Sequence, residues 1–414
     1  MRILVYLFCL FLLPTRGLAD SCHAFEITGL TQTNVSLTLG ELIDQATQGF
    51  PEMSLVQAKS DEAAAYRDYA DSLFAGSHVA QIGYLDHEPI DGFGQKQFDF
   101  SITVQPWQWG ENSAVERIAN AAGTEHKLYR EFVRYSVAGL VRDSLWRIAL
   151  ACFEREKVMQ QMGLASDLLD VVTTRVRSGD LGEADLLLAR SDFLASKAEL
   201  IRVSGKLGHV VYVYQSITGV GEIPGQFEEV RHPIATIDSS HIAIRTLNML
   251  IEKEKAKIAL IRYQTNSQFL LGLGYIRQQE TWGSPAQNSL SVAVDVPFGA
   301  PDRLNTEIAS SNAELNEVIV QRDMLLRNLR LQLQEASRHI EVGTENLQLA
   351  EDRAELAKRY IDIQEVGFRY GEISLSELLT ARKHSFEAIY SLKRQRIVLN
   401  REIALYNQVA GVLP

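Results

Sequence analysis

The chain has 414 residues, of which 46% are hydrophobic and 22% are charged, and it carries a formal net charge of −11. This acidic surplus argues against nucleic acid as a partner, and the apolar content is sufficient for a packed core. The chain has three cysteines, at positions 9, 22 and 152, too few for a disulfide framework.

The first nineteen residues are expected to be a cleavable signal peptide. Arg2 precedes an apolar run over residues 3–13 and a small-residue cleavage site that ends at Ala19, the pattern of a secretory leader. Lipidation of Cys22 is an alternative, although the residues before it, Ala-Asp-Ser, do not match a lipid-attachment site. Because cleavage removes Cys9, two cysteines remain, and no structural disulfide is expected between them.

The rest of the chain contains two repeats of one pattern. The Gly-Tyr pair at residues 83–84 precedes Pro106 as the pair at residues 274–275 precedes Pro297, at an offset of 191 residues. Further along, an Arg-x-Gly turn recurs at an offset of 192. Each repeat predicts a helix, two strands, a very long helix, a glycine turn and a long returning helix.

The expected domains follow these repeats. Repeat 1 covers residues 20–218, a linker 219–233 and repeat 2 residues 234–414, with hairpins at about 78–106 and 268–297, long helices at 111–177 and 303–369, and returning helices at 183–216 and 376–410. Each long helix would extend about 100 Å at 1.5 Å per residue, more than a compact domain requires. Their apolar residues recur every three or four positions among charged ones, which predicts coiled-coil walls.

The strands are the clearest local signal. Apolar and polar residues alternate with period two, which predicts one apolar face; the apolar positions are Phe98, Phe100, Ile102 and Val104 in repeat 1 and Leu290, Val292, Val294 and Val296 in repeat 2. Strands of about 9–11 residues suit a tilted transmembrane strand. A half-buried sheet in a soluble domain is the alternative.

Beyond the leader, no apolar stretch approaches the roughly 18 to 20 residues that a spanning helix requires, so a membrane crossing is expected to use strands. One chain supplies four predicted strands, and open strand edges in lipid leave unpaired backbone groups that cost several kcal/mol each. Several chains would have to pool their strands, and three chains would supply twelve, an even number that suits a barrel.

Several sequence features recur together in one known family. They are the segment LGELIDQA at residues 39–46 with Pro51-Glu52 after it, the strand ends at residues 104–107 and 294–298, and the two Arg-x-Gly turns. In this order, and with the internal duplication, they resemble the TolC family of outer-membrane efflux proteins over almost the whole mature chain.

This resemblance implies the fold class: an α+β membrane protein with a trimeric twelve-stranded transmembrane β-barrel, four strands per chain, continuous with a long periplasmic α-helical coiled-coil barrel. It implies an outer-membrane location with a large periplasmic extension. The implied partners are a periplasmic adaptor protein and an inner-membrane pump of the resistance-nodulation-division or ABC type. Chain length and compact hairpins resemble the heavy-metal cation efflux branch most.

The resemblance also implies the candidate site residues. Relatives carry acidic residues six and nine positions after the second tip glycine, at the pore entrance; here these positions hold Glu377 and Thr380, so one acid is matched and the other is absent. Asp185 holds the place of Glu377 in repeat 1. Their alternative role is that of acids favoured at a helix N-terminus.

Two further groups of residues are singled out. The tips of the long helices are expected to contact the adaptor, through Gly179, Asp180, Gly371 and Glu372. Three aromatic residues at strand ends are expected at a membrane interface or in ordinary packing: Trp107, Trp109 and Phe298.

Catalytic and metal-binding patterns are not evident. The nine histidines include no pair at i and i+4, and no nucleophile elbow or phosphate-binding loop occurs. We therefore expect no enzyme activity, no cofactor and no metal site, but a passive exit duct for small molecules or metal cations. A type I protein secretion duct of the same fold and a periplasmic adaptor protein are the alternatives.

Overall fold

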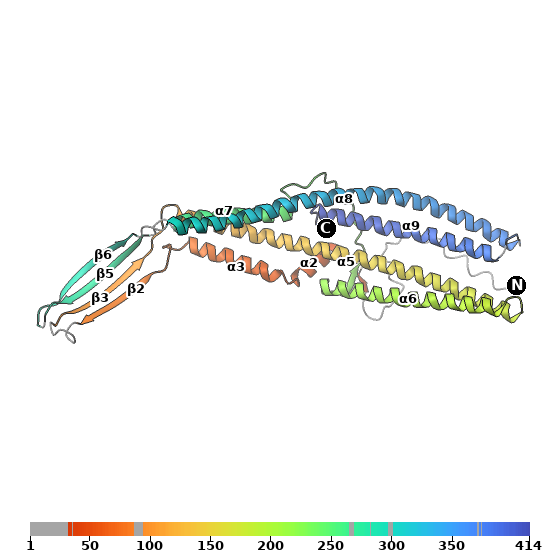
Figure 1. The fold of residues 1–414 in the computed structure, drawn as a ribbon, viewed down its shortest axis with the longest axis horizontal. Coiled ribbons are helices and arrows are strands. Elements are labelled where there is room, and N and C mark those ends of the chain that lie inside the picture. Colours follow the sequence, from red (N-terminus) through yellow and green to blue (C-terminus); the bar gives the residue numbers. More distant parts are fainter. Residues whose placement is uncertain are drawn as a thin grey trace. The chain divides into compact units, whose positions relative to one another are not determined.

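A computed structural model describes residues 32–34, 36–86, 94–264, 269–281, 283–296, 301–370, 372–373 and 375–414. Its elements, in chain order, are β1 (Gln32–Asn34), α2 (Leu39–Gln48), α3 (Met53–Ala70), β2 (Val79–Asp86), β3 (Lys96–Val104), α5 (Glu111–Arg177), α6 (Glu183–Thr218), β4 (Glu222–Pro224), α7 (Ile242–Gln264), β5 (Leu270–Gln279), β6 (Gln287–Asp295), α8 (Pro301–Arg369) and α9 (Leu375–Val409) (Figure 1). Helix α8 begins two residues before the expected start because proline is well tolerated in a first helical turn.

The elements form two compact units that differ from the sequence repeats. Unit 1 takes Met1–Met53, Val133–His241 and Arg327–Pro414, and unit 2 takes Ser54–Phe132 and Ile242–Leu326. Each unit thus draws on both repeats, and α5 and α8 contribute residues to both. Within the described residues, no helix is long and apolar enough to cross a membrane.

Unit 2 contains a four-stranded antiparallel sheet in the order β2-β3-β5-β6. Phe100 lies opposite Ile82 on one side and Tyr275 on the other, and Tyr275 lies opposite Leu290. Residues directly opposite each other share a face, so the predicted alternation is confirmed for β3 and β6, and most of the large apolar residues of the four strands lie on one face.

On the other face of this sheet, Gly274 lies close to a side chain of the neighbouring strand. A Cβ at Gly274 would lie 2.5 Å from Ser291 Oγ of the neighbouring strand, closer than van der Waals contact allows. A missing side chain permits such close cross-strand approach. One face of the sheet therefore carries most of its bulky apolar residues, and the other carries glycines and polar residues together with Val79, Leu85 and Ile276.

The helices of unit 2 bury a small apolar core. Ala70 of α3, Ile118 of α5 and Leu260 of α7 belong to this core, and the ring of Trp107 packs against it. The Trp107 indole Nε1–H donates to the carbonyl of Ser72 at 2.9 Å. These contacts hold the end of β3 close to the end of α3.

In unit 1, four helices pack side by side in the order α6, α5, α9, α8 (Figure 1). An ion pair marks each junction: Lys206 with Glu154 (2.8 Å) for α6 and α5, Lys393 with Glu156 (3.1 Å) for α9 and α5, and Arg396 with Glu351 (3.4 Å) for α9 and α8. Helices α6 and α8 are therefore the two outer edges of this layer.

A buried arginine joins the inter-repeat linker and the chain end to α5. The Arg142 guanidinium donates to both carboxylate oxygens of Glu229 at 2.7 Å and to the carbonyl of Val412 at 3.0 Å. Asn407, also buried, donates to Glu229 and to the carbonyl of Val230. A bidentate arginine–carboxylate pair is geometrically specific, so Arg142 fixes two distant segments at one level of the helix layer.

The prediction that the chain has no structural disulfide is wrong. Cys152, half-buried on α5, is disulfide-bonded, and its partner cysteine lies outside the described residues. The prediction failed because it weighed the number of cysteines against a whole framework, whereas a single bridge needs only two.

Candidate membrane and assembly surfaces

The apolar face of the sheet in unit 2 is uncovered. Nine of its side chains are between 36% and 88% exposed: Ile82, Tyr84, Phe98, Ile102, Leu273, Tyr275, Leu290, Val292 and Val294. They come from all four strands and adjoin one another through the pairing register. Monomeric soluble proteins rarely expose so large a continuous apolar patch, so this face requires an apolar covering.

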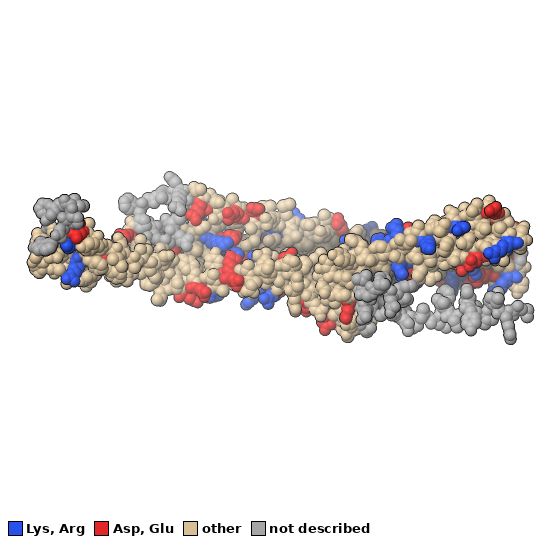
Figure 2. Space-filling view, turned by 90° about the horizontal axis from the view of Figure 1, so that it is seen from below, with Lys and Arg blue, Asp and Glu red and all other residues tan. Residues whose placement is uncertain are grey.

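Charged side chains are sparse over the same region. In Figure 2 the strands, at the left, are mainly tan between their ends, whereas red and blue side chains recur along the helices. Among the described strands, β2 and β6 each pair on one side only. Such edges carry a row of backbone groups that can pair with another chain.

The three aromatic residues at the strand ends have different surroundings. Trp107 packs in the core of unit 2 and donates its indole N–H to Ser72, and its ring centroid lies 5.1 Å from that of Tyr69. Trp109, two residues further on, is fully exposed. Phe298 lies outside the described residues. Ordinary packing therefore explains the position of Trp107, and Trp109 is the better candidate for a residue at a membrane interface.

The outer edges of the helix layer in unit 1 also expose apolar side chains. On α6 they are Leu187, Leu194 and Ile201, and on α8 they are Val342, Leu349, Leu356 and Ile363, all between 42% and 67% exposed. Within each stripe the residues lie seven apart, which is the repeat of a helix–helix seam. Both edges are therefore suited to packing against another helix.

The first helix tip ends in a regular motif. Gly179 has a φ of +81°, its N–H donates to the Val176 carbonyl at 3.1 Å, and the Asp180 N–H donates to the Arg175 carbonyl at 2.9 Å. This is the Schellman pattern, which favours glycine because of the positive φ. The Asp180 carboxylate also accepts from Ser178 Oγ at 2.9 Å.

The second tip has a matching hydrogen bond. The Glu372 N–H donates to the Gly367 carbonyl at 2.9 Å, in the same relative position as the bond from Asp180. Gly371, the expected equivalent of Gly179, lies outside the described residues. Arg382 of α9 forms an ion pair with Glu365 of α8 at 2.9 Å, which joins the two helices near this tip.

The candidate pore residues differ in their local roles. The Asp185 carboxylate accepts the backbone N–H of Gly182 at 3.2 Å, so this residue caps the N-terminus of α6. Glu377 lies in the first turn of α9, where the helix dipole favours an acid, and both Glu377 and Thr380 are exposed. In a single chain, Asp185 therefore has a structural role in the helix start.

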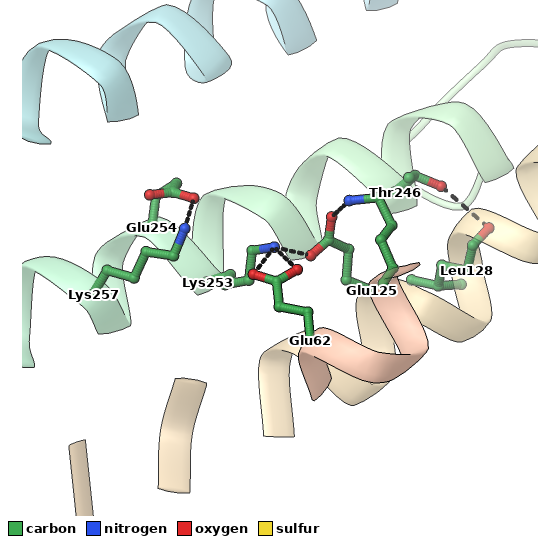
Figure 3. A network of polar contacts seen from close by, with 8 residues as sticks. Glu62, Glu125, Leu128, Thr246, Lys253, Glu254 and Lys257 are labelled. Atoms are coloured by element: carbon green, nitrogen blue, oxygen red, sulfur yellow. Dashed lines mark hydrogen bonds and ion pairs between the residues drawn. The ribbon is translucent and has the colours of Figure 1, made fainter. Parts of the chain in front are cut away.

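Sequence reasoning missed a buried charge network in unit 2 (Figure 3). The Lys253 ammonium lies 2.5 Å from Glu125 and 3.2 Å from Glu62, and Lys59 contacts the other oxygen of Glu125. The side chains of Lys253 and Glu125 are only 4% and 3% exposed. The network joins α3, α5 and α7.

The charges of this network hold one another in the ionised state. Burial by itself would raise the pKa of Glu125, but hydrogen bonds and charges from Lys253 and Lys59 outweigh it, and the pKa is lowered. Burial would likewise lower the pKa of Lys253, yet Glu125 and Glu62 raise it. Glu62 and Lys253 lie 191 residues apart, the repeat offset, so opposite charges at equivalent positions could have revealed the pair.

No group of three or more histidine, cysteine, aspartate or glutamate residues is placed to hold a metal ion within the part of the chain that the structure describes.

Comparisons with known proteins identify the fold. The chain matches no protein-family model, and no curated protein sequence matches it. The CmeC outer-membrane channel of Campylobacter jejuni is similar with a TM-score of 0.69 and 14% identity, over 93% of this chain and 90% of that one. The outer-membrane protein VceC of Vibrio cholerae is also similar, with a TM-score of 0.67 and 13% identity, over 91% of this chain and 97% of that one.

The structure of CusC is similar as well, with a TM-score of 0.63 and 13% identity over 90% of this chain and 91% of that one. These neighbours are TolC-family outer-membrane efflux channels. The predicted resemblance is therefore confirmed for the fold, and it spans nearly the full length of both partners in each comparison. At these identities the likeness concerns the fold alone.

Proposed function

We propose that this chain, which has the fold of the TolC-family channels, is the outer-membrane component of a tripartite efflux system. In this role it forms a passive exit duct across the outer membrane and periplasm. The observation that carries the proposal is the exposed apolar face of the sheet. Lipid would cover that face, and the polar face would line a water-filled interior, as in known transmembrane barrels.

The proposed barrel forms from several chains. Four strands have two open edges, and unpaired edges are not tolerated in lipid. Pairing β6 of one chain with β2 of the next would satisfy both edges and continue the apolar face. Three chains would supply twelve strands, which agrees with the homotrimer that the family resemblance implies.

The helix layer supports the same ring. Its exposed edges are different helices, α6 and α8, so the contact between copies would be head-to-tail, the kind of interface that closes into rings. The stripes also match in level: Leu194 lies eleven residues after the start of α6, and Leu356 lies thirteen before the end of α8. At 1.5 Å per residue these positions differ by about 3 Å along the layer.

The proposed partners act at the two ends of the duct. The helix tips at Gly179, Asp180, Gly371 and Glu372 would meet a periplasmic adaptor protein, and an inner-membrane pump of the resistance-nodulation-division or ABC type would supply the cargo. Small molecules or metal cations are the proposed cargo, with heavy-metal cation efflux as the branch that the sequence resembles. The duct has no enzyme activity in this proposal.

At the entrance, Glu377 is proposed to act as a ring of three carboxylates, since charged rings bias the selectivity of pores. Its exposed place on α9 supports this role. Thr380 would contribute no charge to the ring. Because Asp185 already caps α6, we assign it to helix structure and not to selectivity.

The alternatives are distinguished by context and by fold. A type I protein secretion duct would share this fold and would be encoded beside an ABC transporter and its secreted substrate. A periplasmic adaptor is disfavoured by the duplicated long helices and by the uncovered apolar face of the sheet.

The test is purification from outer membranes in mild detergent, followed by particle mass and single-channel conductance in planar bilayers. We expect a trimeric particle with low, gated conductance. Replacing Glu377 by glutamine should then weaken cation preference, and Thr380→Ser is the control that leaves the charge unchanged. A water-soluble monomer without conductance would contradict the proposed function.

A further inference from the structure

Charged side chains flank the apolar stripes on the two outer edges of the helix layer in unit 1. On α6 they are Arg190 and Lys197, and on α8 they are Asp362 and Glu355, all exposed. Glu355 pairs with Arg359 of its own helix at 2.5 Å. The other three form no side-chain hydrogen bond or ion pair among the residues that the structure describes.

The charges of the two edges lie at matching levels. Helix α6 begins, and α8 ends, at the same end of the layer, so the two helices run in opposite directions (Figure 1). Arg190 lies seven residues after the start of α6, and Asp362 lies seven before the end of α8. Lys197 and Glu355 are each fourteen residues from the same ends. Each of these basic residues on α6 therefore has an acidic residue of α8 at its own level.

The two sets of charges also lie on the same side of the stripes. Arg190 and Lys197 each follow a leucine of the α6 stripe by three residues, which is a backward rotation of about 60°. Asp362 and Glu355 each precede an apolar residue of the α8 stripe by one, a backward rotation of about 100°. When antiparallel helices face each other, residues rotated in the same sense lie on the same side of the contact. An α6 and an α8 that pack through their stripes would therefore bring these charges together.

A third pair of opposite charges, with the signs exchanged, lies at the tips. Glu183 is the first residue of α6 and Arg369 is the last of α8. Sliding α8 by seven residues in one direction would bring Arg190 opposite Arg369. Sliding it in the other direction would bring Glu183 opposite Asp362. Because like charges in contact disfavour a wrong register, only the unshifted register gives opposite charges at all three levels.

The same charges disfavour other pairings of the edges. If two copies packed α6 against α6 in parallel, Arg190 and Lys197 would each face their own counterpart. Charges that flank an apolar helix seam set partner choice and orientation. The pattern on α6 therefore fits an α8 edge, and since the α8 of the same chain lies at the opposite edge of the layer, the partner is a second copy.

We propose that the α6 edge of one copy binds the α8 edge of the next through ion pairs that set the register of the junction. Each pair joins two copies, and the three pairs are Glu183 with Arg369, Arg190 with Asp362, and Lys197 with Glu355. The apolar stripes supply the attraction between the helices, and the charges select the level and the partner. This inference rests on the head-to-tail ring of the proposed function and adds the residues that fix how its copies meet.

The experiment is cross-linking of the full chain in membranes, in a Cys22→Ser/Cys152→Ser background. Arg190→Cys is combined in one chain with Asp362→Cys, with Glu355→Cys or with Arg369→Cys, and each variant is treated with a short bismaleimide. The last two combinations move one cysteine seven residues along α8, or about 10 Å. We expect several times more product linked between copies for Asp362→Cys than for either shifted position.

The alternative outcomes are distinct. More linked product at Glu355→Cys or Arg369→Cys would show a shifted register and overturn the proposed pairs, as would the absence of linked product from all three variants. Particle mass and conductance of the natural chain are separate readouts. A trimer with gated conductance but a shifted register would overturn the pairs alone, whereas a monomer without conductance would overturn the proposed function.

A charge exchange tests whether the pairs contribute to assembly. Exposed ion pairs change an equilibrium by about two- to fivefold, so Arg190→Asp should raise trimer dissociation on dilution by roughly 10- to 100-fold over three junctions. Adding Asp362→Arg in the same chain should restore assembly. Salt should weaken the natural trimer and strengthen that of Arg190→Asp, because it screens attraction in one and repulsion in the other.

The matched control is Arg202→Asp. Arg202 lies on α6 at the other side of the apolar stripe, one residue after Ile201, and pairs with Glu199 of its own helix at 2.5 Å. The variant carries the same change of charge and should assemble as the natural chain does. Unchanged dissociation in Arg190→Asp, an equal loss in Arg202→Asp, or a loss that Asp362→Arg does not restore would overturn the proposed pairs.

Discussion

The sheet and the helices of unit 2 distribute polarity in opposite ways. The sheet exposes its large apolar side chains, such as Ile82, Leu290 and Val292. The helices bury charge, with Lys253 and Glu125 almost wholly inaccessible. The helices bury their paired charges against one another, so their polar groups are satisfied within the chain. The apolar face of the sheet is not covered by the chain itself, so its apolar cover has to come from outside the chain. The contrast indicates two different surroundings within one unit.

The largest effect is expected from breaking the charge network in the helices. Lys253→Met would leave Glu125 buried with Lys59 as its remaining cation, and removal of one partner from a buried pair costs about 3–5 kcal/mol. We expect a corresponding loss in the free energy of unfolding, measured by denaturant titration in detergent.

The matched control is Lys257→Met on the same helix. Lys257 pairs with Glu254 at 2.8 Å on a more exposed part of α7, and such pairs contribute about 0.2–1 kcal/mol. The double variant Lys253→Met with Glu125→Leu should recover much of the stability, because it leaves no unpaired partner at Glu125. If Lys253→Met and Lys257→Met lowered the free energy of unfolding by the same amount, the charge network would not be buried.

The second prediction concerns the two faces of the sheet. Val292→Arg places a charge on the apolar face, where the proposed lipid contact would make it cost about 2–4 kcal/mol, and Ala293→Arg places the same charge on the opposite face one residue later. We expect much less membrane-inserted protein for Val292→Arg than for Ala293→Arg, measured as the detergent-extracted oligomer. Equal amounts of extracted oligomer for the two variants would contradict the assignment of an apolar face and a polar face.

The third prediction concerns the helix edges, where the expected cover is another copy of the chain. Burial of a leucine side chain contributes about 1.5–3 kcal/mol, so Leu356→Glu should weaken each junction between copies by about 2 kcal/mol. Dissociation on dilution, followed by mass photometry, measures this. Leu356→Met retains an apolar side chain of similar volume and should assemble normally.

The smallest effect is expected from pH. Because the pKa of Glu125 is lowered from its ordinary 4.5, its contribution to stability is fully present above pH 4.5 and is lost as the pH falls through the folded-state pKa. The difference in unfolding temperature between the natural chain and Glu125→Gln should therefore be constant near neutral pH and shrink in acid. A difference that grows below pH 4.5 would contradict the network geometry.

Sequence periodicity was sufficient for features that follow from local pattern. The alternation at Phe98 and Val292 predicted the shared apolar face, because side chains in strands alternate strictly. The proline-free stretch from residue 111 predicted α5, because a helix also follows from a local pattern. Both features depend on residues only a few positions apart, so they can be predicted from the sequence of one chain.

Features that depend on distant residues were missed. The local sequence around Lys253 or Glu62 does not show that either residue forms a buried ion pair. Only a comparison of equivalent positions in the two repeats would have predicted that they contact each other. The disulfide at Cys152 was missed because the local sequence of a cysteine does not state its partner. The role of Glu377 as a ring residue stays a prediction, since it depends on other chains.

The most direct test of the proposed ring is cross-linking between its two edges. Leu194→Cys and Leu356→Cys are placed in one chain, in a Cys22→Ser/Cys152→Ser background, and treated with a short bismaleimide in membranes. The two positions lie on opposite edges of the layer, so links should form between copies, and the covalent products should end at three chains. A product that remains one chain, stops at two or continues beyond three would contradict a closed ring of three.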